Sequence, residues 1–233
     1  MCLNNWGGID HKVLEFHEYV NLFSGKSGSG KSTVMDAIQV ILYGSFSPSF
    51  LNKAADDAKN RRSVLSYLRG EQKDGSANRK DCDFCSVIAL EIEDTGTHII
   101  TCIGIAFEVR KSDSEIKKFV YFSHSGKMPE SEYLTEQGVC YSNQEIKKLV
   151  SARTKSDDNR GKGEVNRIYG SKEAYLGTLY DVILGYIDQN RFITMEKSAI
   201  ALKMTNGTGQ FIRDYMFPKN TSNTIATISE QLD

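Results

Sequence analysis

Long hydrophobic runs are absent from this sequence of 233 residues, and no apolar stretch approaches the roughly 18 residues that cross a bilayer. The first eight residues have neither a basic region nor an apolar core, so they do not predict a signal peptide. An excess of charge is also lacking, because 29 lysines and arginines are balanced by 30 aspartates and glutamates. Global charge therefore does not indicate a nucleic-acid partner, and any DNA-binding surface must be local. Together these absences predict a cytoplasmic protein without a membrane partner.

Paired cysteines are also scarce. The five cysteines are an odd number, and only Cys82 and Cys85 lie close together in the sequence. A reducing cytoplasm is the simplest interpretation of this count. The pair has the spacing of a zinc knuckle or a redox motif, but a zinc site needs two more ligands and the sequence has no second pair. We therefore expect both cysteines to be structural.

The strongest motif is the phosphate-binding P-loop, G-x-x-x-x-G-K-[ST], which the sequence matches at every fixed position. The residues are Gly25, Lys26, Ser27, Gly28, Ser29, Gly30, Lys31 and Ser32, followed by Thr33. Glycines let the backbone approach a phosphate closely, and the helix N-terminus then points its N–H groups at the anion. We expect Lys31 to bind the β- and γ-phosphates of ATP, Ser32 to bind Mg²⁺, and Thr33 to add a supporting phosphate contact.

The residues around the P-loop have the pattern that the motif requires. The apolar run at 20–24 predicts a strand that leads into the loop, and a second short strand is expected at 12–16. Residues 34–43 have apolar positions at helical spacing and predict a helix that packs on the sheet. Gly44 and Pro48 are expected to end that helix.

The rest of the chain mixes strand and helix patterns over a length that allows one or two domains. Alternating apolar residues with a turn at 94–97 predict a hairpin over 84–109, which a strand at 118–124 extends to an antiparallel meander. Further expected elements are a broken helix at 54–68, a helix at 143–151, a mobile charged stretch at 153–164, a helix from the cap Ser171 to about 184, a strand at 199–202 and an amphipathic segment at 211–217. Residues 223–232 have apolar positions at spacings of three and four, as at the start of a coiled coil.

A self-sufficient P-loop ATPase also needs a Walker B carboxylate at the end of an apolar strand to hold Mg²⁺. The nearest match is the stretch at 87–94, but Glu91 and Glu93 alternate with apolar residues and face the same side of a half-solvated strand. A Ser-Gly-Gly-Gln-type signature is also missing from the sequence. The chain therefore has the phosphate-binding half of an ATPase site without the catalytic half.

A P-loop near the N-terminus, followed by a β meander and the start of a helix, resembles the N-terminal lobe of an SMC-like ATPase head. Four stretches make it most similar to the JetC proteins, the MukB- and MksB-like SMC subunits of Wadjet anti-plasmid systems. These stretches are 4–9 (NNWGGI), 23–39 (FSGKSGSGKSTVMDAIQ), 63–70 (SVLSYLRG) and 211–215 (FIRDY). The resemblance covers nearly the whole chain.

The resemblance implies an α/β fold, a P-loop NTPase lobe of ABC/SMC type in which an antiparallel meander and helices lead to a coiled coil. Residues 1–217 would form the lobe and 218–233 the start of the coiled-coil neck. The chain would be part of a longer protein, hydrolysing ATP only in a complete head dimer and extruding DNA loops in plasmid defence. The implied partners are a second SMC-like head, kleisin and winged-helix-type subunits, a nuclease subunit and DNA.

Other interpretations of the P-loop stay open. An SbcC-type DNA-repair ATPase head would have the same split arrangement. A transporter-type ABC ATPase would show its signature and Walker B strand within this length, and a P-loop kinase would need an arginine-rich lid. An assembly module that keeps ATP only as a structural ligand is the remaining alternative.

Secondary site residues are predicted in two groups. ABC-class heads use a Q-loop glutamine near Mg²⁺ and the attacking water; we assign this role to Gln210, with Gln189 as the rival. Residues 147–172 contain eight basic and three acidic side chains, and 53–81 contain eight basic and five acidic ones. Such basic stretches can contact DNA phosphates without reading sequence. The candidate DNA contacts are Arg69, Lys155, Arg160 and Lys162, although most charged stretches are only solvated surface.

Overall fold

A computed structural model describes the chain at residues 1–26, 28–48, 51, 63–72, 74–157 and 165–200. The chain divides into two compact units, residues 1–188 and residues 189–233. The described part of the second unit is helix α5 (Gln189–Ile200). The expected boundary between residues 217 and 218, the amphipathic segment at 211–217 and the coiled-coil pattern at 223–232 all lie outside the described residues.

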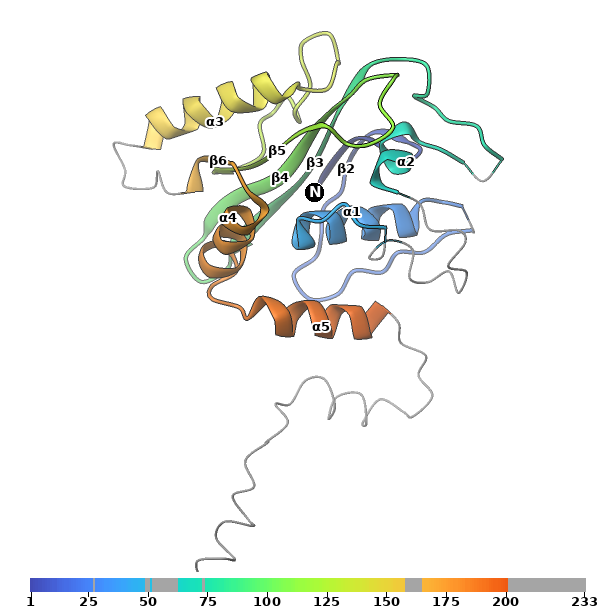
Figure 1. The fold of residues 1–233 in the computed structure, drawn as a ribbon. Helices are drawn as coiled ribbons and strands as arrows, with labels where there is room; N and C mark the ends of the chain where they lie inside the picture. Colours follow the sequence, from blue (N-terminus) through green and yellow to red (C-terminus); the bar gives the residue numbers. More distant parts are fainter. Residues whose placement is uncertain (27, 49–50, 52–62, 73, 158–164, 201–233) are drawn as a thin grey trace, which may run out of the picture. The chain divides into compact units, whose positions relative to one another are not determined.

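The first unit is built on a six-stranded antiparallel sheet with the order β2-β1-β3-β4-β5-β6 (Figure 1). Its strands are β1 (Cys2–Trp6), β2 (Ile9–Val13), β3 (Phe84–Asp94), β4 (Ile99–Val109), β5 (Lys118–Ser125) and β6 (Arg167–Tyr169). The predicted meander is therefore confirmed, with each residue from Phe84 to Asp94 paired to a residue of β4. The turn forms because the Asp94 carboxylate accepts from the N–H groups of Gly96 (2.8 Å) and Thr97 (3.1 Å).

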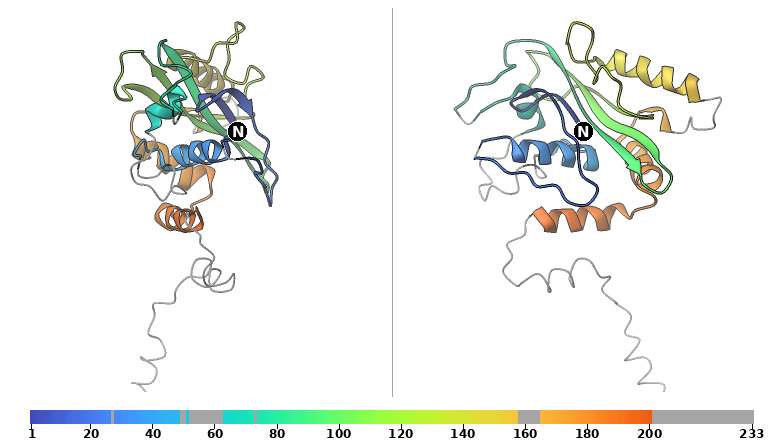
Figure 2. Two further views of the ribbon diagram at one scale, coloured as in Figure 1. Left: turned by 90° about the vertical axis from the view of Figure 1, so that its right-hand side faces the viewer. Right: turned by 180° about the vertical axis from the view of Figure 1, so that it is seen from behind.

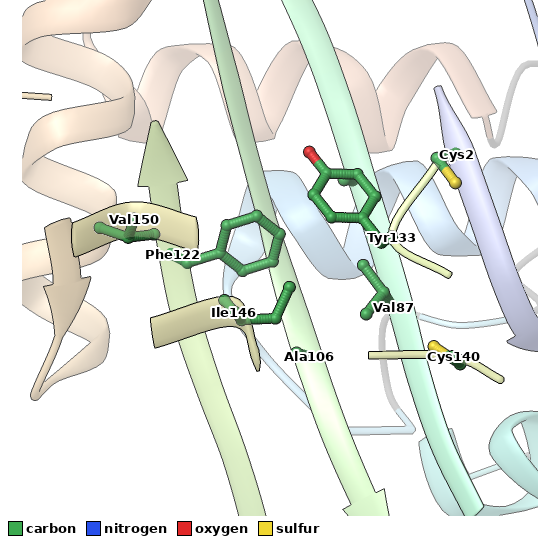
Figure 3. Close-up of a cluster of buried hydrophobic side chains, with 9 residues drawn as sticks. Cys2, Val87, Ala106, Phe122, Tyr133, Cys140, Ile146 and Val150 are labelled. Atoms are coloured by element: carbon green, nitrogen blue, oxygen red, sulfur yellow. The ribbon is translucent and has the colours of Figure 1, made fainter. Parts of the chain in front are cut away.

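Helices cover both faces of this sheet (Figure 2). They are α1 (Lys31–Tyr43), α2 (Val64–Arg69), α3 (Asn143–Asp157), α4 (Lys172–Gly177) and a π-helical turn, η4 (Thr178–Ile183), that continues α4. Adjacent residues of a strand point to opposite faces. Phe122 of β5 therefore packs in a core with Ile146 and Val150 of α3 (Figure 3), while its neighbour Tyr121 lies on the other face, stacked on Tyr175 of α4.

Helix α1 is held firmly at its C-terminal end. The last carbonyl groups of a helix have no partner within the helix and need one from elsewhere. Three tyrosine hydroxyls donate to carbonyl groups there: Tyr175 to Ile41 (2.9 Å), Tyr180 to Leu42 (3.0 Å) and Tyr121 to Gly44 (2.6 Å). Gly44 has a φ of 53° and ends the helix in the left-handed conformation, as predicted.

Several elements differ from the sequence-based expectations. Strands β1 and β6 were not predicted, and the strand expected at 12–16 is β2, which ends at Val13. Strand β1 was missed because two asparagines lower its strand propensity. Tertiary contacts satisfy their amides, since Asn4 donates to Glu132 O (2.8 Å) and Asn5 to Cys85 O (2.7 Å).

The strand predicted at 20–24, before the P-loop, is wrong, because these residues form no strand. An apolar run becomes a strand only where its backbone pairs with a neighbouring strand, and no strand of the described sheet pairs with these residues. The strand expected at 199–202 is also wrong at residues 199–200, which continue α5. Helix α3 extends to Asp157, so the first residues of the stretch expected to be mobile are helical.

Two other expected helices are confirmed in part. Ser171 caps α4 by accepting from Ala174 N (3.2 Å), and the helical segment ends at Ile183 after a change to π geometry. Of the broken helix at 54–68, the described part is α2, which begins after the cap Ser63.

Candidate nucleotide-binding site

The P-loop connects the segment at 14–24 to the N-terminus of α1. Gly28 and Gly30 have φ values of 83° and 88°, in the left-handed region that favours glycine, and Gly30 is the N-cap residue of α1. A Cβ on Gly25 would lie only 2.6 Å from Ser29 Oγ, so a side chain there would meet the loop itself. Ser27 lies outside the described residues. The glycine positions thus allow the tight backbone path that the motif predicts.

The Lys31 ammonium lies within the curve of the loop. It donates to Gly25 O (2.6 Å), Lys26 O (2.9 Å) and Ser29 Oγ (3.3 Å). These three acceptors are all groups of the loop itself. When a phosphate binds, the ammonium can replace these bonds by charge-assisted hydrogen bonds to phosphate oxygens.

The two residues after Lys31 differ in exposure. Ser32 is exposed, so its hydroxyl is available to a cation, whereas Thr33 is half-buried. The Thr33 methyl lies against the turn between β1 and β2, because a Cβ on Gly7 would be 2.5 Å from it. This packing anchors the helix. The predicted phosphate contact of Thr33 stays a prediction.

The N-terminus of α1 suits an anion. Its N-cap makes no side-chain hydrogen bond, and its first turn contains no acidic residue. The positive end of the helix dipole and the N–H groups of the first turn therefore face the loop without an internal carboxylate. Together with the Lys31 ammonium and the Ser32 hydroxyl, these groups fit a nucleoside triphosphate with Mg²⁺.

The segment at 14–24, which leads into the loop, forms neither helix nor strand and exposes large apolar side chains. These are Phe16, Tyr19, Val20, Leu22 and Phe23, with 90% of Leu22 exposed. The Asn21 side chain closes a turn within the segment by accepting from His17 N (2.6 Å) and donating to His17 O (2.8 Å). Apolar exposure of this density is typical of an interaction surface.

The two acids weighed as a Walker B substitute lie away from the P-loop. Glu91 continues the face of β3 on which Val87 and Ala89 pack in the α3 core, and its carboxylate accepts from Met128 N (2.6 Å). Glu93 contacts the His98 ring (3.2 Å) at the hairpin. Among the residues that the structure describes, no group of three or more histidines, cysteines or acids could hold a metal ion. Neither Glu91 nor Glu93 therefore fits the Walker B role, and the Mg²⁺ contact of Ser32 stays a prediction.

The structure describes only some of the other predicted site residues. The Arg69 guanidinium donates to Lys111 O (3.2 Å) and Asp113 O (2.5 Å) in the β4–β5 connection. Lys155 is exposed on α3, and Gln189 begins α5 in the second unit. Gln210, Arg160 and Lys162 lie outside the described residues, so their roles stay predictions.

Cys82 and Cys85, which have the spacing of a zinc or redox motif, form no disulfide. Cys82 is exposed and Cys85 is half-buried, and both thiols are free. Burial raises the pKa of the Cys85 thiol to about 11, which opposes formation of the reactive thiolate.

Sequence reasoning assigned no role to Asp36 of α1, nor to Trp6 and Tyr67, which hydrogen-bond to the first turns of that helix. The Trp6 indole stacks on the Tyr67 ring at 5.0 Å between centroids, and the Tyr67 hydroxyl donates to the Asp36 carboxylate. The sequence contained a signal for two of them, because Trp6 and Tyr67 belong to stretches on which the family resemblance rests.

A loop curved by glycines, a lysine ammonium within the curve and a serine in the first turn of a helix define a P-loop nucleotide-binding domain. The profile of one protein family, described as the P-loop containing region of an AAA domain, matches residues 1–58, about a quarter of the chain. A comparison with curated proteins gives no match. Within the described residues, no helix combines the length and apolar character needed to cross a membrane.

Proposed function

We propose that this chain is the ATP-binding half of an SMC-like, DNA-handling ATPase of the JetC type, acting by DNA loop extrusion in plasmid defence. ATP hydrolysis would require a second lobe that completes the site. The observation that carries the proposal is that the described residues place phosphate-binding groups together, while the nearest candidate for a Walker B acid lies elsewhere. Lys31 and Ser32 stand at the N-terminus of α1, whereas Glu91 lies on the opposite face of the sheet.

The surface before the P-loop supports a two-lobed site. Five large apolar side chains are exposed between Phe16 and Phe23, and β2 is an edge strand of the described sheet. An unpaired edge strand can hydrogen-bond to a strand of another lobe, and exposed apolar groups near it can pack against that lobe. A second lobe that covered this surface would also bring its own groups close to the loop.

Each P-loop group would have a defined part in such a head. The Lys31 ammonium binds the β- and γ-phosphate oxygens and draws negative charge away from the bond that breaks. The Ser32 hydroxyl holds Mg²⁺, and the N-terminus of α1 contributes N–H donors. The nucleotide's Mg²⁺ supplies further charge neutralisation when it is bound. An acid and a signature from the second lobe would position the attacking water and sense the γ-phosphate.

Phosphate release tests the proposal. We expect the 233-residue chain alone to release phosphate from ATP no faster than buffer, because half of the catalytic constellation should not turn over. A C-terminal lobe with a signature and a Walker B strand, joined in cis or added in trans, should restore hydrolysis. The restored rate should rise more than linearly with protein concentration, since two heads must meet to close two sites.

The control for this assay is Lys31→Ala, which should abolish the restored activity. Robust turnover by the chain alone that is abolished by Lys31→Ala would mean that a complete site exists within these residues. The proposal of a split head would then be wrong.

DNA contact is a second part of the proposal and rests on the basic stretch at 147–172. Lys147, Lys148 and Lys155 are exposed on α3. We expect replacement of Lys155, Arg160 and Lys162 by Glu to weaken duplex DNA binding by the assembled complex. The slope of log affinity against log salt should become shallower by about two to three, because each lost phosphate contact removes about 0.9.

The matched control replaces three exposed lysines elsewhere, Lys12, Lys111 and Lys127, by Glu, which makes the same change in net charge. Equal losses of affinity and slope in the two triple variants would show that only overall charge matters. The stretch at 147–172 would then be solvated surface.

A further inference from the structure

The first turn of α1 has no side-chain cap, yet it is fixed from outside the helix. The Trp6 indole Nε1 donates to Thr33 O at 2.8 Å, and Trp6 is fully buried. Thr33 follows Ser32 directly and is two residues from Lys31. The indole therefore holds the part of the helix that carries both predicted nucleotide ligands.

A second contact acts one turn further along α1. Asp36 is 4% exposed and accepts a hydrogen bond from the Tyr67 hydroxyl of α2. Because residues four apart lie on the same face of a helix, Asp36 stands below Ser32. The Tyr67 ring is stacked on the Trp6 indole with only 8° between their planes. The two stacked aromatic side chains thus donate hydrogen bonds to consecutive turns of the helix.

The segments that carry these two rings are joined by hydrogen bonds. Gly7 N donates to Tyr67 O (2.8 Å), which joins the β1–β2 turn to α2. The guanidinium of Arg79, itself 7% exposed, donates to Gly7 O (2.5 Å), Leu68 O (2.9 Å) and Asp10 Oδ1 (2.8 Å). A Cβ on Gly70 would lie 2.6 Å from Gly7 O, so α2 and the turn are in close contact.

We propose that Trp6 and Tyr67 are positioning residues of the nucleotide site, which hold Lys31 and Ser32 in the geometry that binds the triphosphate and Mg²⁺. The inference rests on the proposed function and adds residues that no motif assigns. Phosphate recognition depends on several donors that converge on one group, so a small displacement of the first turn of α1 weakens all of them together. A contact at the other end of the helix has no such effect, although it stabilises the same helix.

The test compares two variants that each remove one donor to a main-chain carbonyl of α1. Trp6→Phe removes the bond to Thr33 O, and Tyr180→Phe removes the bond to Leu42 O at the far end. Urea unfolding should show that both variants are destabilised. Equilibrium dialysis with labelled ATP and Mg²⁺ should show that Kd rises about 3- to 10-fold in Trp6→Phe, the equivalent of one hydrogen bond, and less than 2-fold in Tyr180→Phe.

Trp6 is the only tryptophan in the chain, so its fluorescence reports on this contact in the unaltered protein. Its emission should change on addition of ATP and Mg²⁺, with a midpoint equal to the Kd from dialysis, and the change should be absent in Lys31→Ala. If Trp6→Phe fails to fold, Tyr67→Phe, which keeps the stacked ring and loses the bond to Asp36, takes its place in the dialysis comparison.

The failures of the two ideas are distinguishable. ATP binding by dialysis with equal Kd values in wild type, Trp6→Phe and Tyr180→Phe, and with unchanged Trp6 emission, would overturn the positioning role and leave the nucleotide site standing. Equal rises of Kd in both variants would mean that only general stability matters, which also overturns it. The absence of any ATP binding by the folded wild-type chain would overturn the proposed function itself.

Discussion

Replacing Lys31 by Ala should raise the Kd of the chain for ATP roughly 10- to 100-fold, because a hydrogen bond to a charged group contributes about 1.5–3 kcal/mol. The Lys31 ammonium lies within the curve of the loop, held by Gly25 O at 2.6 Å and Lys26 O at 2.9 Å. Removing it takes away the only side-chain cation of the motif's fixed positions. The measurement is a titration of labelled ATP with Mg²⁺ against variant and wild type, after far-UV circular dichroism has shown that both are folded.

Lys26→Ala is the matched control, because it removes the same charge from the same loop. Lys26 is exposed, and its contact within the loop is made by its main-chain carbonyl, which accepts from the Lys31 ammonium. Its Kd should therefore stay within about 3-fold of wild type, because an exposed charge is screened by water and salt. Equal Kd values for Lys31→Ala and wild type would remove the assignment of the P-loop as a phosphate site.

His124 should make the folded state sensitive to acid between about pH 6.5 and pH 4. The ring is fully buried and lies between Ser125 O (3.0 Å) and the Tyr133 hydroxyl (3.0 Å). Since a carbonyl can only accept, Nδ1 donates to Ser125 O, and Nε2 accepts from Tyr133, which is the neutral form. Burial lowers the pKa of His124 to about 4, with the nearby positive charge of Arg153 adding to the effect.

The sign follows from proton linkage. Between about pH 4 and pH 6.5, the unfolded chain binds a proton at His124 and the folded chain does not, so the free energy of unfolding falls as the pH falls. The full loss below pH 4 is about 3 kcal/mol, from 1.36 kcal/mol for each pH unit between the two pKa values. In urea unfolding at a series of pH values, His124→Gln should be less stable than wild type at pH 7.5 and should lack this part of the decline.

His17→Gln is the control, because His17 is exposed and its substitution leaves the buried ring in place. Its stability should follow the wild-type curve across the whole pH range. If His124→Gln also follows that curve with a constant offset, protonation of the buried ring does not limit stability in acid. The decline would then come from other groups.

The nucleotide site was largely predictable from the sequence, because P-loop chemistry is local. Two glycines, one lysine and one serine at fixed spacing specify the backbone path and the charges, whatever the rest of the fold does. The β meander was predictable for a similar reason, since alternation and an Asp94 turn act over neighbouring residues. The meander is confirmed, and Gly28 and Gly30 have the left-handed backbone that such a loop needs, while the binding roles of the site residues stay predictions.

The support of that site could not be predicted in this way. Trp6, Asp36 and Tyr67 are separated by about 30 residues at each step, and each alone looks like an ordinary core residue or a surface acid. Only the antiparallel pairing of β1 with β3 brings the Trp6 turn beside α1 and α2. Residues 20–24, for which an apolar pattern alone predicted a strand, pair with no strand of the described sheet.

The sequence by itself therefore determined the phosphate-binding loop, the helix that begins at Lys31 and the hairpin that forms the middle of the sheet. Those features depend on residue patterns and turns in continuous stretches of the chain, which propensity and spacing describe well. The tertiary structure decided which face each side chain occupies, that Glu91 lies on the α3 side, and that Trp6 and Tyr67 hold the first turns of α1. Such choices depend on strand partners far apart in the chain, whose pairing is selected by burial of the whole core.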